Sequence, residues 1–144
     1  MRITFFSIIL ITLFSCVSSE SINQPDKQVK RYAFGKGGGF TGDYNEFILG
    51  EDGKVFKYDF KYNREVYYKD LSKEDLTYFM EKIDKLGLEG IDINHPGNIS
   101  NYIEVRIGTT SMNKIVWGDH QYYAPKELTD LHQEVYKKLA EFEP

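Results

Sequence analysis

Cysteine is almost absent from this chain of 144 residues, which contains only Cys16. One cysteine excludes an internal disulfide framework and any zinc site built on several thiolates. Positive charge is also scarce, because 18 lysine and arginine residues face 22 aspartate and glutamate residues, for a formal net charge of −4. That balance argues against a basic nucleic-acid footprint, so we expect no nucleic-acid partner. The length allows one domain.

A hydrophobic run long enough to cross a membrane is also missing near the N-terminus. The apolar stretch at residues 3–14 would span about 18 Å as a helix, against about 30 Å for the hydrocarbon core of a bilayer. Arg2 precedes this stretch and is the only charge in the first nineteen residues, and the small Ser15 follows it. A positive start, a short apolar run and a small residue are typical of an export signal.

The run Leu13-Phe14-Ser15-Cys16 resembles a bacterial lipobox, where a signal peptidase cuts before a cysteine that becomes lipidated. The resemblance implies a lipoprotein signal peptide at residues 1–15 and a mature chain that carries fatty-acyl chains, such as palmitate, on Cys16. Two or more chains form a stable anchor. We therefore expect a protein of the bacterial cell envelope, anchored in the outer membrane or at the cell surface rather than in the inner membrane. The alternative is an ordinary secretory signal with an incidental cysteine.

The rest of the chain predicts a tether and one folded domain. Residues 16–30 comprise the lipidated cysteine and a polar segment without an apolar period, which would have an r.m.s. reach of about 20 Å as a flexible coil. Residues 31–144 are expected to form the single domain. Runs rich in aromatic and β-branched residues predict strands there. The predicted strands are residues 31–36, 43–49, 54–60, 64–69, 102–107 and 114–117.

Two helices are predicted between and after these strands. Ser72 opens a capping-box pattern, an apolar stripe follows at helical spacing, and Gly87 stands where a left-handed C-terminal residue belongs. Pro125 can begin the last helix, since its missing N–H is not needed there. A tight turn is predicted at residues 94–98 and a loop at 108–113. The order favours an α+β fold: an antiparallel sheet of about five or six strands with two helices packed on one face.

Glycine is concentrated in one segment, Gly37-Gly38-Gly39-Phe40-Thr41-Gly42. The spacing formally matches G-x-G-x-x-G, but a strand-like sequence follows where a nucleotide-binding loop needs a helix. We expect no cofactor. A turn or bulge and an exposed binding loop both remain open, and Phe40 either fills the core or faces a partner. These six residues are the candidate binding site.

Recognisable catalytic machinery is missing. His95, His120 and His132 lack the i, i+4 partner of a helical zinc site, so we expect solvated or capping histidines and no metal. No G-x-S-x-G pattern occurs, and the carboxylates are scattered. Several of the 11 tyrosines cluster, which suits either strands or an interface. The clustered tyrosines are Tyr58, Tyr62, Tyr67, Tyr68, Tyr122 and Tyr123.

Two resemblances rest on particular segments. Residues 34–42, 94–98, 117–119 and 125–128 look like small, uncharacterised bacterial lipoproteins. A more distant resemblance is to emfourin, the proteinaceous inhibitor of thermolysin-like metalloproteases. Emfourin-like sequences are similar in their Gly-Gly-Phe-x-Gly after a first strand, a Leu-rich helix, a Tyr-x-Ile/Val strand and a terminal Pro-x-x-Leu helix. The matching positions here are Gly38 to Gly42, Tyr102-Ile103 and Pro125 to Leu128.

The leading hypothesis is a lipid-anchored, non-enzymatic binding domain whose partners are the membrane and a protein. Inhibition of a metalloprotease is its most specific form. An envelope hydrolase that uses scattered carboxylates with His95 or His120, and a structural envelope protein with a tyrosine-rich surface, are the alternatives. The sequence leaves the oligomeric state open.

Overall fold

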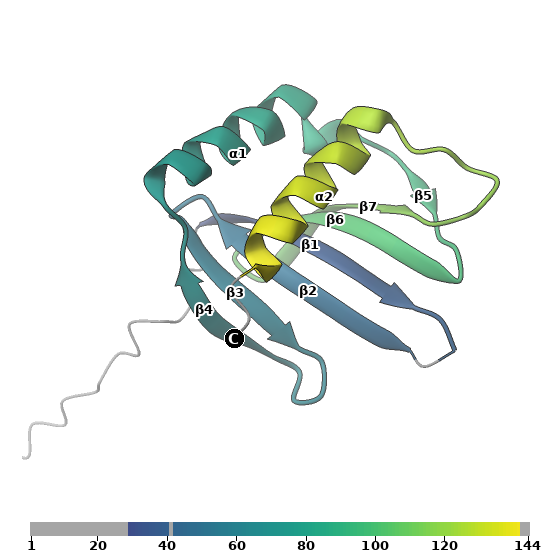
Figure 1. Ribbon diagram of the computed structural model, residues 1–144, viewed down its shortest axis with the longest axis horizontal. Helices are drawn as coiled ribbons and strands as arrows, with labels where there is room; N and C mark the ends of the chain where they lie inside the picture. Colours follow the sequence, from purple (N-terminus) through teal and green to yellow (C-terminus); the bar gives the residue numbers. More distant parts are fainter. Residues whose placement is uncertain (1–28, 41, 142–144) are drawn as a thin grey trace, which may run out of the picture.

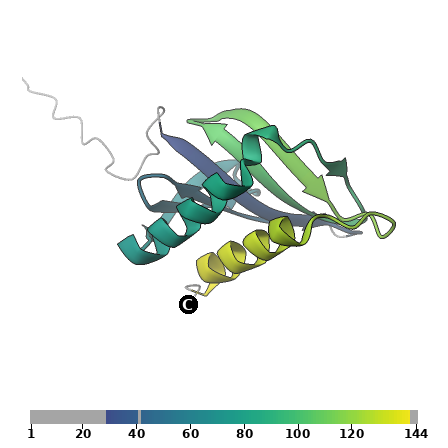
Figure 2. The ribbon, with the colours of Figure 1, turned by 90° about the horizontal axis from the view of Figure 1, so that it is seen from above.

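The computed structural model describes residues 29–40 and 42–141. They form a seven-stranded sheet with two helices lying across one of its faces (Figure 1), and the view from above shows both helices on the same side (Figure 2). The strands follow the order β4-β3-β2-β1-β6-β7-β5. The expected leader, Cys16, most of the tether and Thr41 lie outside the described residues.

The elements are bounded as follows. The strands are β1 Lys30–Gly38, β2 Asp43–Gly50, β3 Lys54–Asp59, β4 Arg64–Asp70, β5 Asn94–His95, β6 Ile99–Ile107 and β7 Thr110–Trp117. The helices are α1 Lys73–Leu86, the short 3₁₀ helix η1 Leu88–Gly90 and α2 Lys126–Ala140.

The predicted α+β class with two helices is confirmed, but the sheet has one more strand than expected and is mixed. β5 pairs parallel to β7, with Asn94 opposite Val116 and His95 opposite Trp117. The segment was predicted as a tight turn, and no period-2 pattern marks it as a strand. Backbone bonds to distant residues hold it in place: Val116 N–H donates to the carbonyl of Ile93 at 2.9 Å.

Two further boundaries differ from the predictions. The segment at 108–113 is mostly strand rather than loop, because the chain reverses sharply at Gly108, whose φ is +58°, and β7 begins at Thr110. The first strand begins at Lys30, one residue before the predicted strand at 31–36.

The helix ends follow local chemistry. At the start of α1, the Ser72 hydroxyl oxygen accepts a hydrogen bond from the Asp75 N–H at 3.1 Å, and Gly87 ends the helix with a φ of +60°. Both features confirm the predicted capping. Pro125 precedes the first helical residue of α2 instead of beginning the helix.

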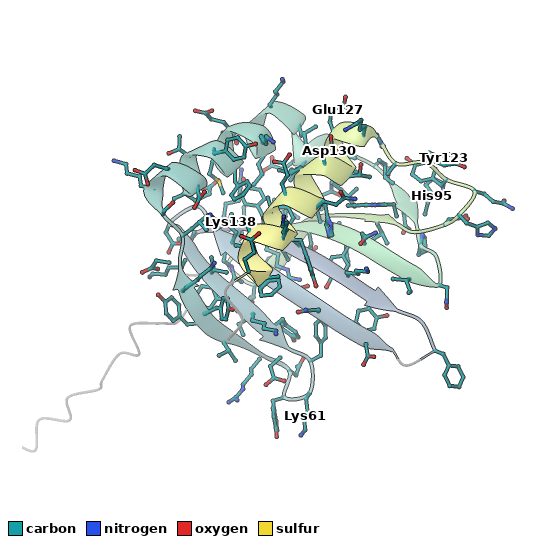
Figure 3. The ribbon with its side chains drawn as sticks, in the orientation of Figure 1. Lys61, His95, Tyr123, Glu127, Asp130 and Lys138 are labelled. Carbon is teal, nitrogen blue, oxygen red and sulfur yellow. The ribbon has the colours of Figure 1, made fainter. Side chains whose placement is uncertain are left out.

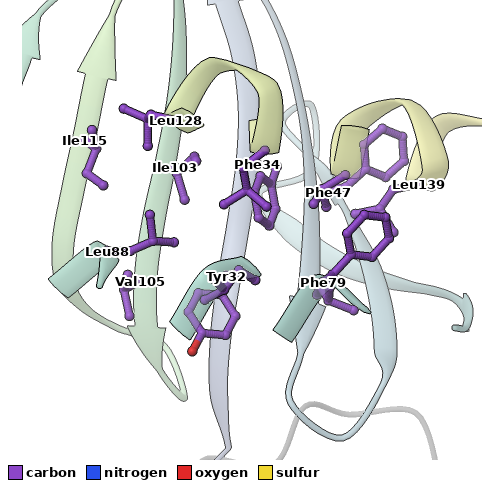
Figure 4. Packing of buried hydrophobic residues seen from close by; sticks show 14 of the residues in the cluster. Tyr32, Phe34, Phe47, Phe79, Leu88, Ile103, Val105, Ile115, Leu128 and Leu139 are labelled. Atoms are coloured by element: carbon purple, nitrogen blue, oxygen red, sulfur yellow. The ribbon is translucent and has the colours of Figure 1, made fainter. Parts of the chain in front are cut away.

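The main core lies between the helices and the sheet (Figure 4). Tyr32 and Phe34 of β1 and Phe47 of β2 face the helices, because alternate residues of a strand point to the same side. Phe79 of α1 and Leu139 of α2 cover them. A cross-helix ion pair ties the two helices together: Lys138 of α2 lies 2.9 Å from the Asp75 carboxylate of α1.

Among the described residues, no helix covers the opposite face of the sheet (Figure 2). Side chains on this face surround a hollow, which we call the trough. A small second cluster of Ala33, Ile48 and Phe56 is buried there. Arg31 of β1 contacts Glu65 of β4 at 2.5 Å although β2 and β3 lie between them. A flat sheet would separate strands this far apart by about 14 Å, so the two long side chains reach toward each other across β2 and β3.

Within the described residues, no helix is both long and apolar enough to span a bilayer.

Candidate functional site

The glycine-rich segment forms the tip of the β1–β2 hairpin. Gly37 and Gly38 belong to β1, so the predicted loop is shorter than expected, and the chain turns through Gly39 to Gly42. Phe40 lies at this tip with its side chain fully exposed. Of the two roles left open for Phe40, the structure excludes core filling.

Positive backbone angles explain the glycines of the turn. Gly38 and Gly39 have φ values of +117° and +78°, which residues with a Cβ rarely adopt. This geometry brings the hairpin against the loop before β6, where the Gly39 N–H donates to the carbonyl of Asn98 at 2.5 Å. The hairpin tip is therefore attached at its base while Phe40 projects from it.

The glycines earlier in β1 have a different role, which is to make room for aromatic rings. A Cβ on Gly35 would stand 1.9 Å from the Tyr102 ring, and one on Gly37 would stand 2.1 Å from the Tyr44 ring. Tyr102 and Tyr44 are their direct neighbours on β6 and β2. Both rings therefore lie against a strand that offers almost no side chains on this face.

A pocket of about 580 Å³ occupies the trough beside these rings. Its walls come from β2, β3, β4, β6 and β7 and from the turns that connect them. The residues lining it are Tyr44, Glu46, Tyr58, Phe60, Asn63, Arg64, Glu65, Tyr102, Glu104, Arg106, Thr109 and Lys114. No sequence pattern predicted this pocket.

Paired charges form the floor of the pocket. The Arg106 guanidinium donates to both carboxylate oxygens of the buried Glu46, at 2.9 and 3.1 Å, and to Glu104 at 2.6 Å. The Tyr102 hydroxyl donates to the same Glu46 carboxylate at 2.6 Å. Lys114 lies 3.8 Å from Glu104 and 4.4 Å from the centre of the Tyr102 ring. Glu46 therefore has a cation and a hydroxyl to replace the water that burial removes.

Burial and charge shift two of these groups in opposite directions. Burial raises the pKa of Tyr102, and the neighbouring Glu46 charge adds to the increase, so the phenol stays protonated. Burial alone would raise the pKa of Glu104, but the hydrogen bonds from Arg106 and Ser111 and the nearby cations outweigh it and lower that pKa. Glu104 is therefore an anion at neutral pH.

A second buried arginine supports one end of the trough. Arg31 at the start of β1 is 1% exposed, and its Nε donates to the carbonyl of Gly108 at 2.8 Å. Its guanidinium also binds both carboxylate oxygens of Glu65, at 2.5 and 3.2 Å. This bidentate pair holds β4 over β1.

Aromatic rings form the wall of the pocket near solvent. The Phe60 ring centre lies 4.8 Å from that of Tyr58 and 5.6 Å from that of Tyr44. Phe60 and Tyr44 remain 44% and 52% exposed. They offer ring faces to whatever enters the pocket.

The histidines lie apart from this pocket, and one of them contradicts its prediction. His132, expected to be solvated or to act as a cap, is buried under α2, with its Nε2 at 2.9 Å from the Gly35 carbonyl oxygen. Burial lowers its pKa to about 4.

The other two histidines lie outside the core. The ring centre of His95 stacks on that of Tyr122 at 3.9 Å, at the same end of the molecule as Tyr123 (Figure 3), and His120 is exposed. Among the residues that the structure describes, no group of three or more His, Cys, Asp or Glu side chains could hold a metal.

The predicted tyrosine cluster divides among several environments. Tyr58 lines the pocket, Tyr67 packs against the small second cluster, and Tyr68 packs against the main core. Tyr62 and Tyr123 are exposed in different connections. These tyrosines therefore form no single surface. The missed residues Glu104 and Arg106 did carry a signal, since opposite charges two positions apart share one face of a strand.

No protein-family model matches the chain, and no curated protein matches it, so the hairpin tip and the pocket carry the functional proposals on their own.

Proposed function

We propose that this chain is a lipid-anchored binding protein of the bacterial envelope, without catalytic activity, and that the tip of its β1–β2 hairpin inserts into a protein partner. In its most specific form, the partner is a thermolysin-like metalloprotease and the protein is its inhibitor. The observation that carries the proposal is the full exposure of Phe40 at a hairpin tip whose base is held by the Asn98 carbonyl.

An exposed phenylalanine at such a position suits partner binding better than folding. Phe40 contributes nothing to the core, yet water solvates its ring poorly. Large aromatic side chains that enter a partner's pocket often dominate the binding free energy. Because β1 is paired on both sides, by β2 and by β6, the hairpin is already ordered. Binding would therefore cost little conformational entropy.

The inhibition test compares two exposed aromatic residues. The purified protein should slow peptide hydrolysis by a thermolysin-like protease without being cleaved. Phe40→Ala should weaken inhibition by about 30-fold, corresponding to about 2 kcal/mol. Tyr123→Ala, which removes an exposed ring from the connection before α2, should leave inhibition unchanged.

Two results would count against this version. An absence of inhibition at micromolar concentration across several thermolysin-like enzymes would remove the protease as the partner. Equal loss in the Phe40 and Tyr123 variants would remove the hairpin tip as the contact.

The hydrolase alternative has one observation in its favour and two against it. The pocket brings together three carboxylates, those of Glu46, Glu65 and Glu104. His95 and His120, however, do not line it. Hydrolysis of a glycosidic bond also needs one carboxyl group that holds a proton near neutral pH, whereas Arg106 keeps Glu104 ionised. These features favour binding over hydrolysis.

The third alternative, a structural envelope protein acting through a tyrosine-rich surface, has less support, because the tyrosines are dispersed. Cross-linking in intact cells would separate it from the inhibitor hypothesis by naming the partner. A protease captured through the hairpin supports inhibition, and a structural envelope component captured elsewhere on the surface contradicts it.

A further inference from the structure

We propose that the pocket in the trough binds a neutral saccharide, such as a short oligosaccharide or the end of a glycan chain. This site is separate from the hairpin tip, and the inference does not depend on a protease partner.

The shape of the pocket follows from the residues beneath it. On the side facing the trough, β1 presents only Ala33, Gly35 and Gly37 after Arg31. This part of the sheet surface is therefore low, while the neighbouring strands carry long side chains. The resulting hollow of about 580 Å³ lies within the range of about 300–1,000 Å³ that is usual for small-ligand sites.

The charges around the hollow are balanced in pairs. Arg106 binds Glu46 and Glu104, and Lys114 also lies near Glu104. On the opposite wall, Arg31 pairs with Glu65, and Arg64 lies 3.8 Å from Asp59. The lining of the pocket itself carries the three cations Arg64, Arg106 and Lys114 and the three anions Glu46, Glu65 and Glu104. A charged ligand would need an unbalanced site, so the pocket favours a neutral one.

The aromatic wall favours a ligand with flat apolar patches. Phe60 and Tyr44 expose parts of their rings at the pocket while Tyr58 supports Phe60 from the side. The negative faces of aromatic rings attract weakly positive C–H groups. A pyranose ring offers such C–H groups on its faces and hydroxyl groups around its edge.

Polar side chains at the margin and the floor of the pocket could bind those hydroxyl groups. Lys114 is 48% exposed at the side chain, and Asn63 and Thr109 are exposed at the margin. Glu104 supplies acceptor oxygens at the floor, fixed in direction by Arg106. A floor of oriented acceptors beside an aromatic wall therefore matches a hydroxyl-rich ligand.

The test measures saccharide binding to the full chain, held in a zwitterionic detergent because sugar-headed detergents would compete. Cellobiose and N,N′-diacetylchitobiose serve as neutral probes, observed by saturation-transfer NMR and titrated to obtain Kd. We expect binding in the range of about 1 mM or tighter. Because the ligand is neutral, the affinity should not change between low and high salt.

A matched pair of variants locates the site. Phe60→Ala removes the aromatic wall and should weaken binding by about tenfold or more. Tyr123→Ala removes an exposed ring elsewhere and should leave the affinity unchanged. Circular dichroism establishes that both variants fold.

Three results would overturn the proposal. They are no binding of either disaccharide, binding that Phe60→Ala leaves unchanged, and preferential binding of inorganic phosphate or an uncharged tripeptide at the same residues. Protease inhibition can fail without affecting any of these outcomes, so the two proposals are tested separately.

Discussion

At the scale of single residues, the trough depends on glycines, which have no side chain to fill it. Gly35 faces Tyr102 on one side of the sheet, while its carbonyl oxygen lies 2.9 Å from His132 on the other. Gly35 therefore lies between the floor of the pocket and the main core under the helices. Any added atom would have to displace the Tyr102 ring, whose hydroxyl holds Glu46.

Replacing Gly35 with alanine tests this role. The new Cβ would lie 1.9 Å from Tyr102 Cζ, so the ring must move and its hydrogen bond to Glu46 is lost. We expect a loss of about 1–3 kcal/mol in the free energy of unfolding, measured by urea denaturation. Gly90→Ala is the control, because a Cβ there meets nothing within 4 Å, and its effect should stay within about 0.5 kcal/mol. Equal effects of the two changes would argue against the packing role.

His132 provides the second residue-scale prediction, a dependence of stability on pH. The imidazole packs near Trp117 and Tyr136, and burial lowers its pKa from 6.5 to about 4. Between those values the unfolded chain binds a proton that the folded chain does not. The contribution of His132 to the free energy of unfolding is therefore complete above pH 6.5 and is lost as the pH falls towards 4, a loss of about 3 kcal/mol.

The matching variant is His132→Gln, which keeps an N–H donor and removes the titration. Urea unfolding at several pH values should give a flatter profile for this variant than for the parent between pH 7 and pH 4. Parallel profiles would mean that other groups cause the acid sensitivity.

At the scale of elements, β6 places opposite charges on one face and apolar residues on the other. Ile103 and Val105 face the helices, while Glu104 and Arg106 face the trough with Tyr102. The strand thus belongs at once to the core and to the pocket floor. Its pairing in the middle of the sheet keeps Arg106 aligned with Glu46 of β2.

Arg106→Ala should be strongly destabilising because it leaves the Glu46 carboxylate buried without its cation. The expected loss is about 3 kcal/mol or more in unfolding free energy. Adding Glu46→Gln to Arg106→Ala should recover part of it, since a neutral amide costs less to bury than a charge. Lys126→Ala removes an exposed pair with Asp130 and should not measurably change the unfolding midpoint. If the double variant is no more stable than Arg106→Ala, the charge explanation is wrong.

A comparison of the elements shows which parts of the fold are determined by residues close together in the sequence. Ser72, Gly87 and the apolar stripe between them determine α1 through contacts within a few residues, so the helix could be predicted. β5 could not, because Asn94 and His95 become a strand only by pairing with β7. The pocket was missed for the same reason: Glu46 and Arg106 are 60 positions apart and meet only when β1 pairs with both of their strands.

The candidate site could be located in the sequence by its high glycine content, but its backbone conformation could not be predicted. The sequence pattern singled out Gly37 to Gly42 and left open whether the run forms a turn or bulge or an exposed binding loop. The structure divides the run into strand glycines that admit rings and turn glycines that set backbone angles. Thr41 stays untested.

At the scale of the whole molecule, we expect a lipid anchor at Cys16, a protein partner at Phe40 and a saccharide in the pocket. Cys16→Ala should move the protein from the membrane fraction to the soluble fraction of fractionated cells, because the lipid chains would be lost. Immunoblotting of both fractions measures the shift, and mass spectrometry of the parent should find an acylated N-terminal cysteine. Retention of the variant in the membrane fraction would contradict the anchor.

The length of β1 separates Phe40 from the residues before Lys30, where the expected tether would join the folded domain. Nine residues of strand extend about 30 Å, and Phe40 follows the far end of that strand. A partner bound at Phe40 would therefore lie about one strand length from the point of attachment, which leaves room for a bulky protein beside the anchored end.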